Sequence, residues 1–181
     1  MSDRIEIVRL HSLPSGLEHL RDEAVRHGFG FLDRLIEDWT GGTNNFSGSG
    51  ECLLGALADG RLVGIGGLNA DPYLPRVDLG RVRHVYVLEA WRRKGVGQAI
   101  IGRLVREAQG RFSELRLRTD RTAAAAFYIG CGFGPVDDPS ASHSFKLVGC
   151  AQHSPARSSR AASSQVAGTA DPRYKGAQRI R

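Results

Sequence analysis

The segment around Gly95 places two glycines one residue apart, at the point where a strand gives way to a helix. RVRHVYV, from Arg81 to Val87, alternates as a strand does, and apolar residues recur at helical spacing after Gly95. The first N–H groups of a helix lack partners within it, and glycine lets a bulky anion approach them. Three cations stand directly before this helix: Arg92, Arg93 and Lys94. The pattern predicts a phosphate-binding site.

Other phosphate motifs fit this segment less well. The pattern GxxxxGK[ST] is absent, and the dinucleotide fingerprint GxGxxG would need a glycine where Ile100 stands. A Rossmann fold would also begin a strand–helix series near the N-terminus, whereas a pair of helices and a hairpin come first here. A glycine-tolerant helix start with solvated cations remains the alternative interpretation.

The remaining periodicity predicts alternating strands and helices. Asp59-Gly60 separates two apolar runs and suits a two-residue turn between antiparallel strands. Ser15 to Glu18 has the form of a capping box, and Asp120 is placed to cap the last helix. The predicted elements are strand 5–10, helix 17–28, helix 31–39, strands 52–58, 61–69 and 81–87, helix 96–110, strand 114–119, helix 120–130 and strand 144–148.

Length and charge divide the chain into two parts. At 181 residues, with 41% apolar residues, the chain suits one ordinary domain, which we expect at residues 1–149. The formal net charge is +6, yet residues 150–181 alone hold six cations and one anion. This Ser-, Ala- and Arg-rich tail has few large apolar residues, so we expect it to be disordered. The domain itself is nearly neutral.

Cysteine use and the N-terminus favour a reduced, cytoplasmic location. Cys52, Cys131 and Cys150 contain no CxxC pair and have no nearby histidine cluster, so we expect neither disulfides nor a metal site. The start, MSDRIEIVRL, lacks the apolar core of a signal peptide. No apolar run is long enough to cross a bilayer, so no membrane partner is expected.

The segment VYVLEAWRRKGVGQAIIGRLVREA resembles the acetyl-CoA-binding core of the GNAT acetyltransferase superfamily. The family motif Arg/Gln-x-x-Gly-x-Gly/Ala is matched by Arg92, Gly95 and Gly97. AAAAFYIGCGF, from Ala123 to Phe133, is similar to the later helix and turn of that family. Two motifs in the right order are more specific than either alone.

The resemblance implies the fold and the reaction. The fold is α/β (α+β): a mixed, mostly antiparallel sheet flanked by helices, in the order β-α-α-β-β-β-α-β-α-β, splayed between the fourth and fifth strands. The implied activity is transfer of an acetyl group from acetyl-CoA to a primary amine, by direct attack in a ternary complex. The near-neutral domain favours a small-molecule acceptor, and dimers are common in the family, so a homodimer is one expected assembly.

The resemblance also assigns residues to the co-substrate acetyl-CoA. The pyrophosphate would lie on the main-chain N–H groups between Arg93 and Gln98, and the pantetheine arm would pair with main-chain groups of Val85 and Val87. A main-chain N–H near Val87 would stabilise the oxyanion. The expected cofactor-binding set is Val85, Val87, Arg92, Arg93, Lys94, Gly95, Val96, Gly97 and Gln98. Tyr128 matches the tyrosine expected to protonate the leaving thiolate as general acid.

The base that deprotonates the amine is less clearly marked. Strand alternation would put Arg81, Arg83, Val85 and Val87 on one face and Val82, His84 and Tyr86 on the other. His84 is a candidate base, although a half-buried strand histidine is more often structural. Asp78, Glu89 and a chain of water molecules are alternatives. Arg81 and Arg83, if they face the acceptor, would favour an anionic acceptor.

Three other functions compete with the small-molecule enzyme. The chain could bind acetyl-CoA without catalysis, as a sensor or partner module. It could instead acetylate protein or peptide amines. The tail could bind nucleic acid through phosphates, although it lacks the interleaved aromatic residues of a base-stacking surface.

Overall fold

A seven-stranded mixed sheet forms the centre of the protein, and the computed structural model describes residues 4–147. The strands are β1 (Ile5–Leu10), β2 (Cys52–Ala58), β3 (Arg61–Ala70), β4 (Leu79–Val87), β5 (Glu114–Leu117), β6 (Gly134–Asp138) and β7 (Ala141–Lys146). The helices are α1 (Leu17–Arg26), α2 (Phe31–Thr40), α3 (Val96–Ala108) and α4 (Thr122–Gly130), with a short 3-10 turn η1 (Glu89–Trp91). In space the strands follow the order β1-β2-β3-β4-β5-β7-β6.

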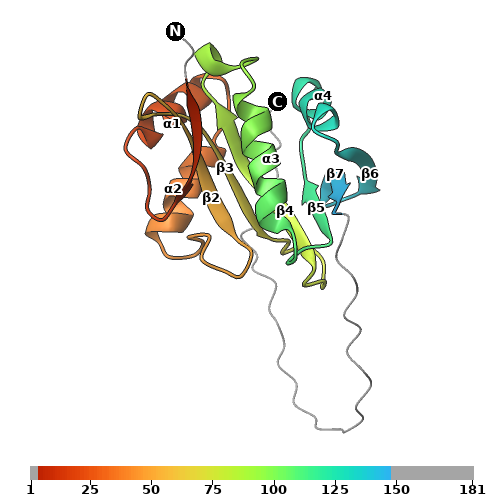
Figure 1. Cartoon of the computed structure of the whole chain (residues 1–181). Helices are drawn as coiled ribbons and strands as arrows, with labels where there is room; N and C mark the ends of the chain where they lie inside the picture. The colour runs from red at the N-terminus through yellow and green to blue at the C-terminus, as the bar shows by residue number, and fades with distance from the viewer. Residues whose placement is uncertain (1–3, 148–181) are drawn as a thin grey trace, which may run out of the picture. The chain divides into compact units, whose positions relative to one another are not determined.

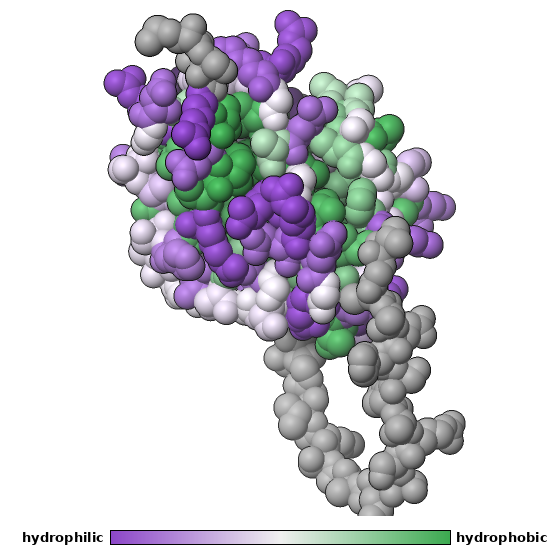
Figure 2. Space-filling view, in the orientation of Figure 1, coloured by the Kyte–Doolittle hydropathy of each residue, from purple (hydrophilic) through white to green (hydrophobic). Residues whose placement is uncertain are grey.

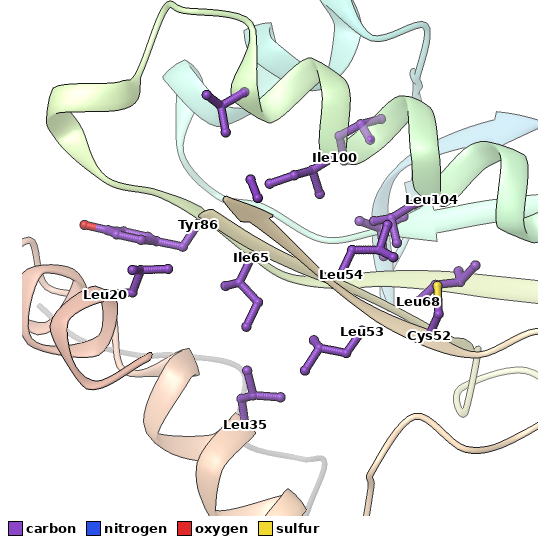
Figure 3. Packing of buried hydrophobic residues seen from close by; sticks show 14 of the residues in the cluster. Leu20, Leu35, Cys52, Leu53, Leu54, Ile65, Leu68, Tyr86, Ile100 and Leu104 are labelled. Carbon is purple, nitrogen blue, oxygen red and sulfur yellow. The ribbon is translucent and has the colours of Figure 1, made fainter. Parts of the chain in front are cut away.

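Helices cover both faces of this sheet, with α1 and α2 on one face and α3 and α4 on the other (Figure 1). Leu20 of α1 and Leu35 of α2 lie towards Ile65 of β3, while Ile100 of α3 lies over the opposite face near Leu54 (Figure 3). All five side chains are fully buried. The core therefore consists of two apolar layers with the sheet between them, which fixes α3 against β3 and β4.

The fourth and fifth strands separate along most of their length. They are the one parallel pair in the described sheet and are joined through three positions: Leu79 with Glu114, Gly80 with Leu115, and Arg81 with Arg116. Beyond Arg81, β4 continues to Val87 while β5 pairs with β7. The expected splay is confirmed. Such an opening exposes main-chain groups of β4 to a ligand.

The structure differs from the expectations at the C-terminal end of the sheet. Residues 134–138 form β6, a strand that was not predicted, and it pairs antiparallel with β7. β7 begins at Ala141 instead of residue 144 and ends at Lys146. The sequence GPVDD does not alternate and starts with Gly-Pro, which hides the strand. The end of the predicted strand at Val148 and the predicted disorder of 150–181 lie outside the described residues.

The N-terminal caps of two helices differ from the expected ones, although α1 begins at Leu17 as predicted. The residue before α1 is Gly16, with φ 89°, and no side chain caps this helix, so the predicted capping box of Ser15 and Glu18 is wrong. Arg121 precedes α4 and again no side-chain cap is present, so Asp120 does not cap it. Between residues 4 and 147, no helix is both long and apolar enough to cross a membrane.

Candidate active site

The loop that enters α3 presents a concave row of main-chain N–H groups. Arg93 has φ 58° and Gly95 has φ 81°, both in the left-handed region. Within residues 4–147, no backbone carbonyl accepts a hydrogen bond from the N–H groups of residues 93–98. Left-handed residues in a turn direct successive N–H groups to one side, and the resulting concavity binds anions. The geometry fits the phosphate site predicted from the sequence.

Gly97 lets α4 approach the first turn of α3. A Cβ atom added at Gly97 would lie 3.0 Å from the ring of Phe127 and 3.8 Å from Val87. A side chain there would have to displace the α4 aromatic ring. The glycine motif thus serves two needs, because Gly95 supplies the left-handed turn and Gly97 the close packing.

Arg92 anchors this loop to the end of β4. Its Nε donates to the carbonyl of Val87 at 3.0 Å, and its Nη2 donates to the hydroxyl of Tyr86 at 3.1 Å. Glu23 of α1 lies 4.0 Å from the same guanidinium. Arg92 therefore holds the loop against β4, while the exposed side chains of Arg93 and Lys94 supply positive charge beside it.

A β-bulge in β4 changes which side chains face the helices. His84 and Val85 together lie opposite Gly66, and His84 has φ 52°. Val85 approaches Gly66 on the face covered by α3, whereas His84 contacts Phe31 on the face covered by α2.

The expected alternation along β4 is therefore wrong beyond Arg83. Arg81 and Arg83 share a face with His84 and Tyr86, because the bulge inserts one residue into the period. Val85 shares the opposite face with Val82 and Val87. The pairing partners show this arrangement: Leu68 opposite Val82 lies on the α3 side, and Gly67 opposite Arg83 lies on the Phe46 side.

His84 is held as a neutral imidazole. Its Nδ1 lies 2.9 Å from the carbonyl oxygen of Phe31, so the proton is on Nδ1 and is donated to that oxygen. Its Nε2 is buried and has no hydrogen-bond partner within the described chain. Burial first, and then the charge of Arg83, lowers the pKa of His84 to about 3. This environment does not favour His84 as a base, and its proposed role stays a prediction.

Tyr128 lies on α4 in an aromatic group. Its ring centroid is 5.1 Å from that of Phe127 and 5.8 Å from that of Phe133. Burial raises the pKa of Tyr128 well above its usual range, with a smaller contribution from Cys131. The hydroxyl is therefore protonated at neutral pH. It is in the state required of a proton donor.

Comparison with known proteins decides the family. Residues 15–133 match the model of the Acetyltransferase (GNAT) family. The chain belongs to the GNAT acetyltransferase family. No curated protein matches it in sequence.

Solved GNAT structures agree with this assignment. A candidate acetyltransferase from Exiguobacterium sp. 255-15 is 25% identical, with a TM-score of 0.71 over 79% of this chain and 93% of that one. The glucosamine-6-phosphate N-acetyltransferase of Arabidopsis thaliana is 14% identical, with a TM-score of 0.55 over 77% of this chain and 97% of its own. The ribosomal-protein-S18-alanine N-acetyltransferase of Escherichia coli is 16% identical, with a TM-score of 0.59 over 80% and 94%. The last two similarities show the fold alone.

The other candidate bases of this GNAT domain lie away from the bulge. Asp78 stands just before β4 and pairs with Arg76 at 2.7 Å. Hydrogen bonds from Arg76 and Ser113 lower the pKa of Asp78 well below its usual range. Glu89 is exposed and lies 3.6 Å from His27. The lowered pKa makes Asp78 a weaker base. Across residues 4–147, no three His, Cys, Asp or Glu side chains gather as a metal site would require.

A hollow of about 260 Å³ lies between α3 and α4 of this GNAT domain. Gln98, at the end of the loop row, forms part of its wall together with Ile101, Gly102, Val105, Gly130, Cys131 and Phe145. Figure 2 shows hydrophobic surface over α4 and beside α3 on this side of the molecule. The hollow extends the loop site along α3, so a long ligand held by the loop has an apolar surface to contact.

Two buried ion pairs, which sequence reasoning missed, stand at the closed end of the opening. Arg81 bonds Asp71 at 3.0 Å and donates to the carbonyl of Ser140 at 2.8 Å. Arg116 bonds Asp138 at 2.7 Å. The one sequence feature that could have indicated the position of Arg116 was the alternation in ELRLRT, which places Arg116 and Leu115 on opposite faces of the sheet. Its partner aspartate lies in the hairpin that was not predicted.

Proposed function

We propose that this GNAT protein moves an acetyl group from acetyl-CoA to the primary amine of a small molecule, by direct attack in a ternary complex. The observation that carries the proposal is the opening between β4 and β5, which leads directly into the loop of unpaired N–H groups. Family membership supports the same reaction. We choose a small-molecule acceptor because the formal charges of residues 1–149 nearly cancel.

The chain offers main-chain groups for each part of acetyl-CoA. The N–H groups of residues 93–98 would bind the pyrophosphate, with Arg92 holding the loop in shape. The N–H of Leu88 donates to the carbonyl of Val63 in β3. Because peptide groups alternate along a strand, those of Val87 and Val85 point to the opening, where the pantetheine arm would pair with them.

The reaction then needs one bond formed and one broken. Acetyl-CoA supplies an activated acyl carbon. The amine nitrogen forms a bond to this carbon, and the bond between the carbon and the CoA sulfur breaks. The amine loses one proton, and the leaving thiolate gains one from the Tyr128 hydroxyl. A main-chain N–H near Val87 stabilises the negative oxygen between these events. An alkyl amine has a pKa of about 10.4, so its first proton must also leave before attack.

We propose that water, and not a side chain, takes the amine proton. The pKa of about 3 makes His84 a very weak base. Hydrogen bonds from Arg76 and Ser113 lower the pKa of Asp78, and Glu89 lies beside His27 at 3.6 Å. A water chain through the β4–β5 opening requires no particular residue.

The experiment is a product assay with a matched pair of variants. The protein, acetyl-CoA and a panel of amines are incubated, and mass spectrometry detects amines heavier by one acetyl group, together with released thiol. Tyr128→Phe should lower kcat by about 100-fold, the usual size of a general-acid contribution, while acetyl-CoA binding is kept. The control Tyr73→Phe removes the hydroxyl of a loop tyrosine but keeps the ring that lies 4.4 Å from the Arg81 guanidinium, so it should lower kcat far less than Tyr128→Phe.

The outcomes separate the competing functions. Unchanged kcat in Tyr128→Phe would remove the role assigned to that residue. Binding of acetyl-CoA without turnover of any amine or peptide would favour the sensor module. Turnover of peptide amines alone would favour the protein acetyltransferase.

A further inference from the structure

Two buried polar atoms without partners flank the opening between β4 and β5. They are Nε2 of His84 on β4 and Nη1 of Arg116 on β5. The third such atom in the described chain, Nε of Arg21, lies 3.1 Å from the carboxylate of Asp22 and is accounted for. A buried polar group without a partner is destabilising, so each of the two needs an explanation.

Both atoms belong to the same face of the sheet. Arg116 is paired in register with Arg81, and its neighbour Leu115 approaches Gly80 and Phe112 on the α3 side. Arg116 therefore points to the α1/α2 side, where His84 contacts Phe31. Arg81 and His84 are three residues apart along β4, which is about 10 Å between backbone positions.

The two atoms have complementary hydrogen-bonding roles. Because His84 carries its proton on Nδ1, its Nε2 has a free lone pair and accepts a hydrogen bond. Nη1 of Arg116 donates, and only 5% of the Arg116 side chain is exposed. A guanidinium has five N–H donors in a planar fork, so it can bond Asp138 and a second anion together.

The electrostatic setting at this face is positive. Arg83 and Arg34 both lower the pKa of His84, which means that positive potential reaches its imidazole. Arg81 is engaged by Asp71 and Ser140. Among the described residues, Arg116 has a buried donor without a partner at this end of the opening, whereas strand alternation had pointed to Arg81 and Arg83.

We propose that the acceptor is a small amine that carries an anionic oxygen group. Nη1 of Arg116 binds the anionic oxygen, and Nε2 of His84 accepts a hydrogen bond from the amine. The inference rests on the proposed acetyl transfer and deepens it, because it assigns the acceptor's chemical class. Arg116 binds the substrate from the closed end of the opening, and His84 orients the nitrogen beside the bulge.

The test compares amines that differ by one charged group. The pairs are β-alanine with β-alaninamide, and O-phosphoethanolamine with ethanolamine, which distinguish a carboxylate from a phosphate. We expect the acidic member of at least one pair to show a kcat/KM about tenfold higher or more, as for a hydrogen bond to a charged group. Equal or better turnover of both neutral amines overturns the proposal and leaves acetyl transfer standing. If no amine reacts, β-alanine and O-phosphoethanolamine are titrated calorimetrically into the CoA-loaded protein. If neither of them binds, the proposed anionic acceptor is overturned.

Variants at Arg116 locate the anionic oxygen. Arg116→Gln should raise KM for the acidic amine about tenfold or more, and by a much larger factor than KM for the neutral amine. Arg103→Gln is the matched control, because it removes an arginine of α3 that pairs with Glu107 at 2.7 Å on the other face. An equal loss for acidic and neutral amines contradicts the assignment.

A second variant covers the case in which Arg116→Gln does not fold. Asp138→Asn removes the carboxylate that competes for Arg116. The asparagine keeps an Oδ1 atom, which can still accept the hydrogen bond that the N–H of Ser140 donates to Asp138 at 2.7 Å in the wild type. Freed of its anion, Arg116 should bind the acidic amine more tightly and lower its KM. An unchanged or higher KM counts against the proposal. Acetyl-CoA calorimetry on the wild type tests the proposed function separately.

Discussion

At the scale of single residues, His84 combines two unfavourable features. It holds a left-handed backbone, with φ 52°, in the middle of a strand, and it buries a polar ring. Non-glycine residues rarely adopt this backbone, although asparagine tolerates it well. The bond from Nδ1 to Phe31 and the packing against Phe46 keep the ring in place. Such costs are typical of positions where geometry serves function.

The buried neutral state of His84 predicts a pH-dependent stability. Its pKa is about 3 in the folded protein against an ordinary 6.5. Between these values the unfolded chain binds the proton and the folded chain does not, so the free energy of unfolding rises with pH. The contribution is complete above pH 6.5 and is lost as the pH falls towards 3. The loss is up to about 1.4 kcal/mol per pH unit.

His84→Asn should remove this dependence while keeping the backbone geometry. Chemical denaturation of wild type and variant at pH 7 and pH 4.5 measures it. The wild type is expected to lose more stability than the variant over this interval. Equal losses would show that the imidazole titrates normally in the fold.

The same residue shows where sequence reasoning stopped. RVRHVYV alternates regularly, so strand alternation assigned each of its side chains to one face of the sheet. Nothing in this pattern indicates that a bulge is present. The residues before the bulge were placed correctly relative to one another, and those after it were inverted. The loop at Gly95 could be predicted because its conformation requires a positive φ angle, which glycine adopts readily and which a glycine in the sequence therefore indicates.

At the scale of elements, the position of α3 depends on a glycine in β3. A Cβ atom added at Gly66 would lie 2.6 Å from Cγ2 of Ile100 and 3.4 Å from Val85. α3 therefore packs directly against β3 at Gly66, the residue that lies opposite the bulge. This contact sets the height of the helix whose first turn carries the N–H row.

Gly66→Ala should therefore destabilise the fold by roughly 1–3 kcal/mol through overpacking. Ile100→Ala alone should cost about 2–5 kcal/mol as a cavity. The double variant should be more stable than the sum of the two losses predicts, because the removed atoms make room for the added methyl group. Urea denaturation of the four proteins measures the coupling, and strict additivity would mean that the two positions do not touch.

Elements were predicted well where periodicity was strong. The hairpin at Asp59-Gly60 is confirmed, with both residues at positive φ and Ala58 paired with Arg61. The β6–β7 hairpin was missed because its strands are short and polar and their burial is partial. Arg116 and Asp138 could not be brought together without this hairpin, so the acceptor site that we propose at Arg116 could not be predicted from the sequence.

At the scale of the whole molecule, ligand binding and stability are coupled. The loop that would hold acetyl-CoA joins β4 to α3, and both pack into the continuous apolar cluster that includes α1 and α2. A ligand that binds only the folded state stabilises it by about 2.7 kcal/mol at roughly one hundred times its Kd. For a domain of this size, that raises Tm by roughly 5–10 °C.

The thermal shift should depend on the loop. Acetyl-CoA is expected to raise the Tm of the wild type, as followed by circular dichroism, and not that of Gly97→Asp, which puts a negative charge and a clash with Phe127 in the N–H row. The matched control is Gly134→Asp, where an added Cβ meets nothing within 4 Å. An equal shift in the Gly97 variant would place binding elsewhere.

The central claim is that this chain binds acetyl-CoA at the start of α3 and uses it. Isothermal calorimetry of acetyl-CoA against the full chain tests this most directly, with Gly97→Asp and Gly134→Asp beside the wild type. The account predicts binding at one site with a Kd on the order of micromolar, lost in Gly97→Asp and kept in Gly134→Asp. Absence of binding to the wild type would contradict both the transferase and the sensor.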